Sequence, residues 1–201
     1  MKFKNIKKAL SHARMATYEK YTNQEQALEL YHWNLRTSSA ILECIAVCEV
    51  VIRNAVSEAL ANAYGDKWCW DSAFVGSLQH KARTALMKAS MDSDDIDRVI
   101  PELPFFFWQS LFTARFDNKI WNDHLQIALP NAKDIKIRGE IFNDLERIRK
   151  LRNRIAHHEP IFQRNLKLDY QITIKLIEYR CADTAAWVRQ WQSVDMVLNL
   201  K

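Results

Sequence analysis

The stretch Arg147-Ile-Arg-Lys-Leu-Arg-Asn-Arg-Ile-Ala-His-His-Glu-Pro-Ile-Phe162 combines a helical apolar repeat with the densest group of chemically capable side chains in the chain. With the residues just before it, the stretch places apolar side chains at steps of four and three, the repeat of one buried stripe on a helix. These residues are Ile141, Leu145, Ile148, Leu151 and Ile155. Pro160 disfavours helical geometry at Glu159 and cannot continue a helix interior, so the predicted helix runs from about 135 to 158.

The last two turns of this helix and its exit hold six polar residues: Arg152, Asn153, Arg154, His157, His158 and Glu159. Asn153 and His157 lie one helical turn apart, so Asn153 can hydrogen-bond the imidazole and fix its tautomer. Arg152 lies about 140° from His157, yet an arginine is long enough for both heads to converge on one phosphate. Histidine would move a proton there. Alternatively, the two histidines only satisfy the carbonyl groups at the helix end.

The segment Arg152-Asn-Arg-Ile-Ala-His157 fits the R-x4-H pattern of the HEPN ribonuclease superfamily, with a polar residue after the arginine. The longer string at 151–162 resembles the signature of the Abi-like proteins, the bacterial abortive-infection D/F type. The similarity continues upstream in short stretches at 30–35, 49–54, 64–68 and 107–111, and so covers roughly residues 25–190. The resemblance implies an all-helical, HEPN-like bundle and RNA cleavage in defence against phage.

Composition independently favours one helical domain over the whole chain, residues 1–201. Only three glycines and four prolines punctuate 201 residues, of which 48% are hydrophobic. Such a chain has enough apolar residues for a substantial core and too few turn residues for a β fold. We therefore expect an all-α domain with long central helices, additional short helices and a basic N-terminal helix within residues 1–22.

The longest central helix is predicted to begin at Thr22 or Asn23 and to end at Gly65, because neither glycine nor proline lies between. One helix, or two in line broken near residues 37–39, satisfies the pattern. Within it, Glu49 and Arg53 are spaced for an ion pair, with Asn54 alongside. Either this polar group docks the central helix against the 135–158 helix, or Arg53 and Asn54 lie near the active site and contact RNA.

The net charge of +5 is concentrated around the 135–158 helix. Eight cations stand there against four acids, and they are Lys133, Lys136, Arg138, Arg147, Arg149, Lys150, Arg152 and Arg154. A nucleic-acid backbone is the natural partner of such a surface. An ordinary solvated helix face is the alternative. Because no apolar run approaches the ~18 residues of a membrane span, we expect a cytoplasmic protein with no membrane partner.

No cofactor or metal site is predicted. Cys44 and Cys48 lie one turn apart and can supply two ligands, but Cys69 and Cys181 lack the close spacing of a zinc knuckle. Small buried thiols are the alternative interpretation. Adjacent histidines on a helix point about 100° apart, which does not suit a shared metal ion.

Two function hypotheses remain. The first is a metal-independent endoribonuclease in which His157 transfers protons, Arg152 stabilises the phosphate and Asn153 orients His157. The auxiliary or RNA-contacting residues would be Arg149, Lys150, Arg154, His158 and Glu159. One His157 per chain supplies part of an acid–base pair, and the HEPN resemblance implies a homodimer with a composite site. The second is a non-catalytic module that binds a small RNA or a neutralising antitoxin. Only the first depends on His157.

Overall fold

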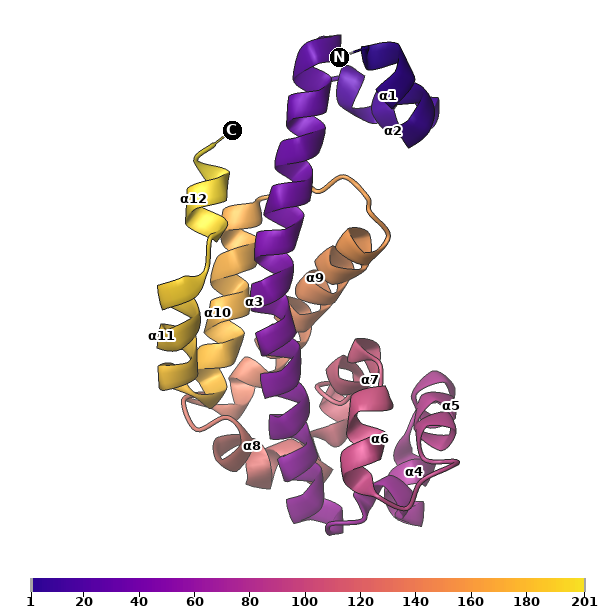
Figure 1. The fold of residues 1–201 in the computed structure, drawn as a ribbon. Coiled ribbons are helices and arrows are strands. Elements are labelled where there is room, and N and C mark those ends of the chain that lie inside the picture. The colour runs from indigo at the N-terminus through magenta and orange to yellow at the C-terminus, as the bar shows by residue number, and fades with distance from the viewer. Residues whose placement is uncertain (1, 201) are drawn as a thin grey trace.

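The computed structural model describes residues 2–200, and all regular secondary structure in that range is helical. The prediction of an all-α fold is confirmed. The molecule is built along α3 (Gln24–Tyr64), a single helix of 41 residues that runs its full length (Figure 1). At 1.5 Å per residue, α3 is about 60 Å long. Asn23 caps its start by accepting from the Gln26 N–H, and Gly65, at φ +88°, ends it. The break considered near residue 37 is absent.

Two groups of helices pack on opposite sides of α3 (Figure 1). On one side, α10 (Leu166–Arg180) lies along α3, α11 (Ala182–Trp191) packs on α10, and α12 (Val194–Leu198) packs mainly against α3. On the other side lie shorter helices around an aromatic cluster. Their bounds are α4 (Ser72–Ser77), α5 (His80–Ala89), α6 (Ile96–Glu102) and α7 (Phe105–Ser110). The cluster centres on the buried Trp68, which contacts Phe74, Phe107 and Trp108.

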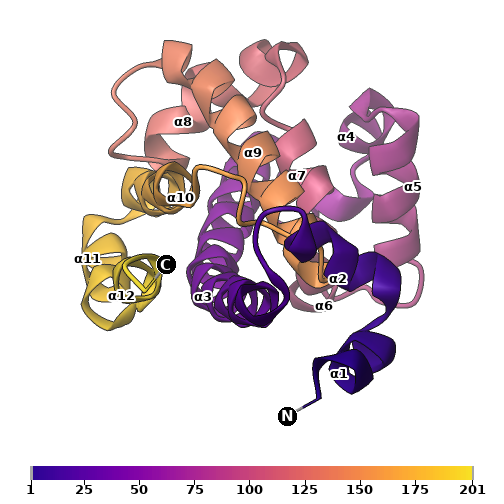
Figure 2. The same ribbon diagram turned by 90° about the horizontal axis from the view of Figure 1, so that it is seen from above.

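The N-terminal segment forms two helices, where the sequence had predicted one. Helices α1 (Phe3–Leu10) and α2 (His12–Glu19) are separated by Ser11, whose φ of +76° breaks the helix. The Ser11 hydroxyl accepts from the Arg14 N–H and so starts α2. An ion pair of 2.7 Å between Lys7 and Glu19 holds the two helices together. Figure 2 shows α2 beside the loop that follows α9, while α1 projects from the edge of the molecule.

Residues 68–137 also contain four short non-α turns. They are η1 (Trp68–Trp70), η2 (Ala114–Phe116), the π-helical η3 (Asp117–Trp121) and η4 (Ile135–Ile137). Helix α8 (Asn122–Ala128) follows η3 directly, and α9 (Arg138–Ala156) follows η4. The predicted helix over 135–158 therefore corresponds to η4 and α9. No helix within residues 2–200 has the length and apolar character that a bilayer span requires.

Candidate functional site

Helix α9 is fixed by the apolar stripe that its sequence predicted. All five stripe residues are buried, namely Ile141, Leu145, Ile148, Leu151 and Ile155. Their common face packs against α3, α7 and α10. The buried stripe sets the rotation of α9, and with it the direction in which every polar side chain of this helix points.

The end of α9 is a Schellman motif formed without glycine. His158 occupies the left-handed position, with φ +55°. Its N–H donates to the Ile155 carbonyl at 2.9 Å, and the Glu159 N–H donates to the Arg154 carbonyl at 2.8 Å. This pair of bonds satisfies carbonyl groups that a helix end leaves open. The helix stops at Ala156, three residues before Glu159, whose helical geometry Pro160 disfavours, and a defined turn replaces a frayed end.

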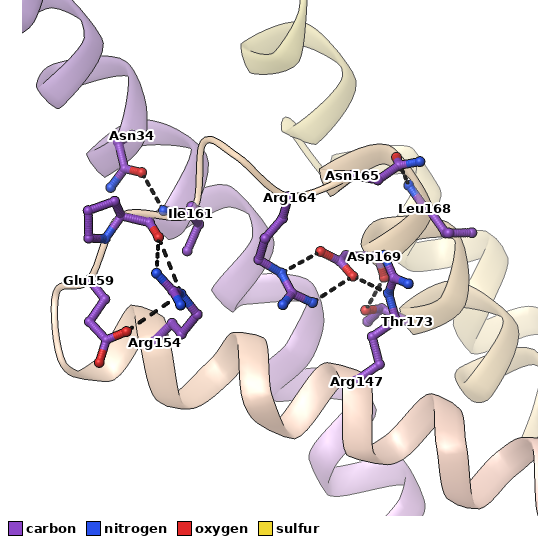
Figure 3. Close-up of polar contacts among 11 residues, drawn as sticks. Asn34, Arg147, Arg154, Glu159, Ile161, Arg164, Asn165, Leu168, Asp169 and Thr173 are labelled. Atoms are coloured by element: carbon purple, nitrogen blue, oxygen red, sulfur yellow. Dashed lines mark hydrogen bonds and ion pairs between the residues drawn. The ribbon is translucent and has the colours of Figure 1, made fainter. Parts of the chain in front are cut away.

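Three side chains, one each from α2, α3 and the end of α9, hold this exit turn, which we define as residues 157–162. Arg14 of α2 donates to the His158 carbonyl. Arg154 donates to the Pro160 carbonyl from Nε at 3.2 Å and from Nη2 at 2.7 Å. The buried Asn34 of α3 accepts from the Ile161 N–H at 2.8 Å (Figure 3). Ile161 and Phe162 are themselves buried, so the turn is anchored in the core.

The exit turn presents its histidines to solvent. His157, His158 and Glu159 are all exposed. Within the described chain, the His157 ring has no hydrogen bond or ion pair, and the expected bond from the Asn153 amide to this ring is not formed. Instead, the Asn153 backbone carbonyl accepts from the His157 N–H at 3.0 Å. His157 is therefore an imidazole on a well-held backbone, with its ring available to a ligand.

Arg152 lies at the same end of α9 but faces α3. Its Nε is 3.8 Å from Oε2 of Glu49, an ion pair too long for a hydrogen bond. Glu49 thus pairs across to α9, and the predicted pair with Arg53 is not formed. Arg53 Nε is buried and has no hydrogen-bond partner in residues 2–200. Asn54 is exposed and lines a different cavity with Ser57 and Glu58, at α6.

Much of the positive charge around α9 is used inside the molecule. Arg138 pairs with Asp117 at 2.7 Å. Arg149 donates to the buried Gln109 at 2.5 Å. Lys150 lies at the surface and pairs with Glu146 at 3.1 Å. Of the residues expected to contact RNA, Arg149 and Arg154 therefore also hold α9 to its neighbours, whereas Lys150 remains accessible.

A buried carboxylate that the sequence analysis did not single out lies beside α9. Asp169 of α10 is completely buried, and Arg147 and Arg164 both bind it (Figure 3). Asn34, the other missed residue, carries the same kind of signal. Each is a polar residue in the buried row of an otherwise apolar helix, which requires a specific partner. Asn34 also falls inside the 30–35 stretch that carried the family resemblance.

The cysteines and acids do not gather around one point. In the described residues, no group of three or more His, Cys, Asp or Glu side chains is placed to hold a metal ion. Cys44, Cys48 and Cys69 are buried, and burial raises the pKa of the Cys44 and Cys69 thiols to about 12. Burial raises the pKa of Cys48 as well. These three thiols stay protonated near neutral pH.

The fold and the exit turn define an all-α protein that displays an arginine–histidine segment at the end of a buried helix. The model of the Abi-like protein family matches residues 2–163, and the chain belongs to this family. The match includes α1 and α2, which precede the range expected from the resemblance, and ends just after the exit turn. No curated protein and no solved structure matches the chain. Membership implies a role in abortive infection, the defence of bacteria against phage.

Proposed function

We propose that this protein is a cytoplasmic endoribonuclease of abortive infection that cuts RNA with His157 and Arg152. The observation that carries the proposal is the exit turn. Its backbone is held from three sides, yet the His157 ring is exposed and engages no other described residue. A side chain that is accessible to solvent while its backbone is held in place is typical of a group that contacts a ligand.

RNA supplies its own nucleophile, so the protein need provide only proton transfer and charge stabilisation. An imidazole removes the proton from the 2′-hydroxyl, the 2′-oxygen attacks the adjacent phosphorus, and the bond to the 5′-oxygen breaks. A second group, acting as a general acid, protonates that leaving oxygen. The products are a 2′,3′-cyclic phosphate and a 5′-hydroxyl. No metal ion is required, because guanidinium groups can stabilise the phosphorane charge.

Arg152 is suited to that charge-stabilising role by its loose attachment. Its side chain is 42% exposed, and its contact with Glu49 spans 3.8 Å. Ion pairs of this exposure contribute little stability, so a phosphate can displace the carboxylate at small cost. Glu49 meanwhile keeps the guanidinium close to the end of α9.

A single chain provides one His157, whereas the reaction uses a base and an acid. We therefore place two chains at each site, in a homodimer whose two exit turns face one RNA. A two-fold axis is the commonest way to bring the same segment of two chains together. The asparagine expected to fix the His157 tautomer would make that contact only when RNA or the second chain orders the ring.

The test compares wild type with His157→Ala and Arg152→Ala on a mixed RNA pool in excess EDTA. Loss of one general acid or base lowers the rate by about 10²–10⁴. Loss of one phosphate-stabilising group costs about 10²–10³. The matched control is His158→Asn, which removes the neighbouring exposed imidazole but tolerates the left-handed backbone. This control should retain most of the activity.

The product ends decide between the alternatives. Cyclic phosphates that disappear in His157→Ala support the proposal. Cutting that needs magnesium and leaves 5′-phosphates would assign the protein to the metal-dependent nucleases. Absence of cutting, together with tight RNA binding that His157→Ala leaves unchanged, would favour the non-catalytic module for a small RNA or an antitoxin.

A further inference from the structure

A cavity of about 540 Å³ opens between α9 and the start of α10. Its lining includes two guanidinium groups, one ammonium group and two carboxamides, from Arg147, Arg164, Lys150, Asn143 and Asn165. Asn165 already caps α10 through its oxygen, which accepts from the Leu168 N–H at 3.0 Å. The exit turn follows the C-terminal end of the same helix, α9 (Figure 3).

A buried carboxylate fixes both guanidinium groups. Asp169 Oδ1 accepts from Arg147 Nε at 2.5 Å. Arg164 reaches the same carboxylate with Nε at 3.0 Å and Nη2 at 3.1 Å (Figure 3). Because a guanidinium carries five N–H donors, Arg147 keeps both Nη groups and Arg164 keeps Nη1 for a further acceptor. The two planes are thus oriented before any ligand arrives.

The acids around the cavity are neutralised by neighbouring lysines. Asp144 pairs with Lys175 at 2.5 Å, and Glu146 pairs with Lys150 at 3.1 Å. With Asp169 between its two arginines, four cations face three carboxylates and one positive charge remains. The side chains of Lys150 and Glu146 are 60% and 37% exposed, so an anion can replace Glu146 as the partner of Lys150 at a small cost in free energy.

We infer that this cavity binds a backbone phosphate of single-stranded RNA, upstream or downstream of the phosphate that His157 acts on. Lys150, Asn153 and His157 follow one another at intervals of three and four, and so share one face of α9. The seven helical steps from Lys150 to His157 span about 10 Å. A strand held at the cavity can therefore extend along that face to the exit turn. The choice of RNA as ligand rests on the proposed function, whereas the anion site rests on the cavity itself.

Binding can be measured apart from cleavage with a labelled 2′-O-methyl RNA oligonucleotide, which has no free 2′-hydroxyl and cannot be cut. Fluorescence anisotropy over a range of salt concentrations gives Kd and its salt slope. Loss of one phosphate contact reduces that slope by about 0.7, equivalent to roughly fivefold weaker binding at 0.1 M salt relative to 1 M. We expect this change in Lys150→Gln. Lys67→Gln removes an exposed lysine after the far end of α3 and should leave binding unchanged.

Two further variants separate orientation from charge. Asp169→Asn adds one positive charge to the cavity but loosens both arginines. Binding should weaken at least fivefold if orientation governs the site, and it should strengthen if net charge governs it. Circular dichroism verifies that the variant is folded. Arg147→Lys keeps the charge and a donor for Asp169 but loses the free Nη groups, and it should weaken binding whether or not Asp169→Asn folds.

Unchanged affinity in both Lys150→Gln and Arg147→Lys would overturn the cavity as a strand site. So would full displacement of the oligonucleotide by an equal concentration of inorganic phosphate, which would assign the cavity to a free anion. Failure of the nuclease proposal looks different. In that case RNA stays intact while the oligonucleotide still binds and still responds to Lys150→Gln.

Discussion

At the scale of single residues, the exit turn depends on His158, a bulky side chain in a backbone conformation that favours glycine. A non-glycine residue in that conformation costs about 1–2 kcal/mol. The surrounding contacts therefore have to hold it, and Arg14 is the one that reaches the His158 carbonyl itself. Because His157 directly precedes His158, this contact also helps to fix the backbone of His157.

Arg14→Ala is expected to reduce RNA cleavage by about 10- to 100-fold through a displacement of His157 of the order of 1 Å. The fall should appear in kcat, with KM nearly constant, because Arg14 hydrogen-bonds the exit turn and is not expected to contact RNA. Arg14→Lys retains a donor and should recover much of the rate. As a matched control, Lys8→Ala removes an exposed cation of the preceding helix, α1, and should leave both constants unchanged. Equal kcat in wild type and Arg14→Ala would refute this role.

Thiol reactivity offers a test at the same scale that does not depend on function. Burial raises the pKa of the Cys44 and Cys69 thiols to about 12, whereas hydrogen bonding from Thr184 lowers the pKa of Cys181. A raised pKa leaves less thiolate at pH 8 and a lowered one leaves more. Ellman's reagent should therefore titrate one thiol per folded chain, Cys181, and four after unfolding in guanidinium. Rapid reaction of Cys44 would contradict the burial.

At this scale, the sequence predicted only those features of the residues that depend on their neighbours in the chain. Pro160 indicated where α9 stops, and the stripe indicated which side of it is buried. The partners of Arg149 and Arg154 could not be predicted, because Gln109 and the folded-back Pro160 carbonyl are brought to them by tertiary structure. Charge counting had assigned both arginines to an RNA surface. Glu49 was expected to bond within its own helix, and it reaches α9 instead.

At the scale of elements, α9 and α10 are joined by one buried charge cluster. Asp169→Ala removes an acceptor of three hydrogen bonds from a fully buried position. Arg147 and Arg164 keep side-chain exposures of 35% and 25%, so they can partly return to water. We therefore expect a loss of about 2–3 kcal/mol in the free energy of unfolding, below that of a fully buried orphaned charge.

Urea denaturation followed by circular dichroism measures this loss. Glu29→Ala is the matched control, because Glu29 is an exposed acid of α3, and it should change the free energy of unfolding by less than about 0.5 kcal/mol. A similar small effect in both variants would show that the cluster does not join α9 to α10.

Element boundaries show a physical limit of the sequence analysis. The absence of glycine and proline predicted one helix or two in line over α3, and the structure has the single helix, since nothing in it breaks helical hydrogen bonding. The division of the N-terminal helix at Ser11 was missed, because a serine that caps α2 looks the same as a serine inside a helix. What distinguishes the two is packing of α2 against α3, which brings Arg14 to the exit turn.

At the scale of the whole molecule, the family match and the fold have different limits. The match ends at residue 163, yet α10 packs along α3 and contributes core residues such as Leu176 and Ile177. The scarcity of turn residues predicted a helical chain with one extensive core. It did not predict which helices would be neighbours, because pairing depends on side-chain shapes and not on periodicity.

Sedimentation velocity at micromolar concentration tests the proposed dimer. We expect a two-fold dimer that brings the 152–158 segments of both chains together, and cleavage per chain that falls on dilution as dimers dissociate. A mixture of His157→Ala with excess wild type should reveal how many histidines each site uses. A stable monomer with undiminished activity on dilution would contradict the composite site.

Arg14 and His158 are separated by 144 positions in the chain. A ribosome that adds about 5–20 residues per second needs roughly 7–30 s to make the stretch between them. The contact between Arg14 and the exit turn therefore cannot form until His158 has been made, and no nascent chain shorter than 158 residues carries a finished turn. For a protein proposed to cut RNA, this order of events would protect the messenger RNA from which the protein is being translated.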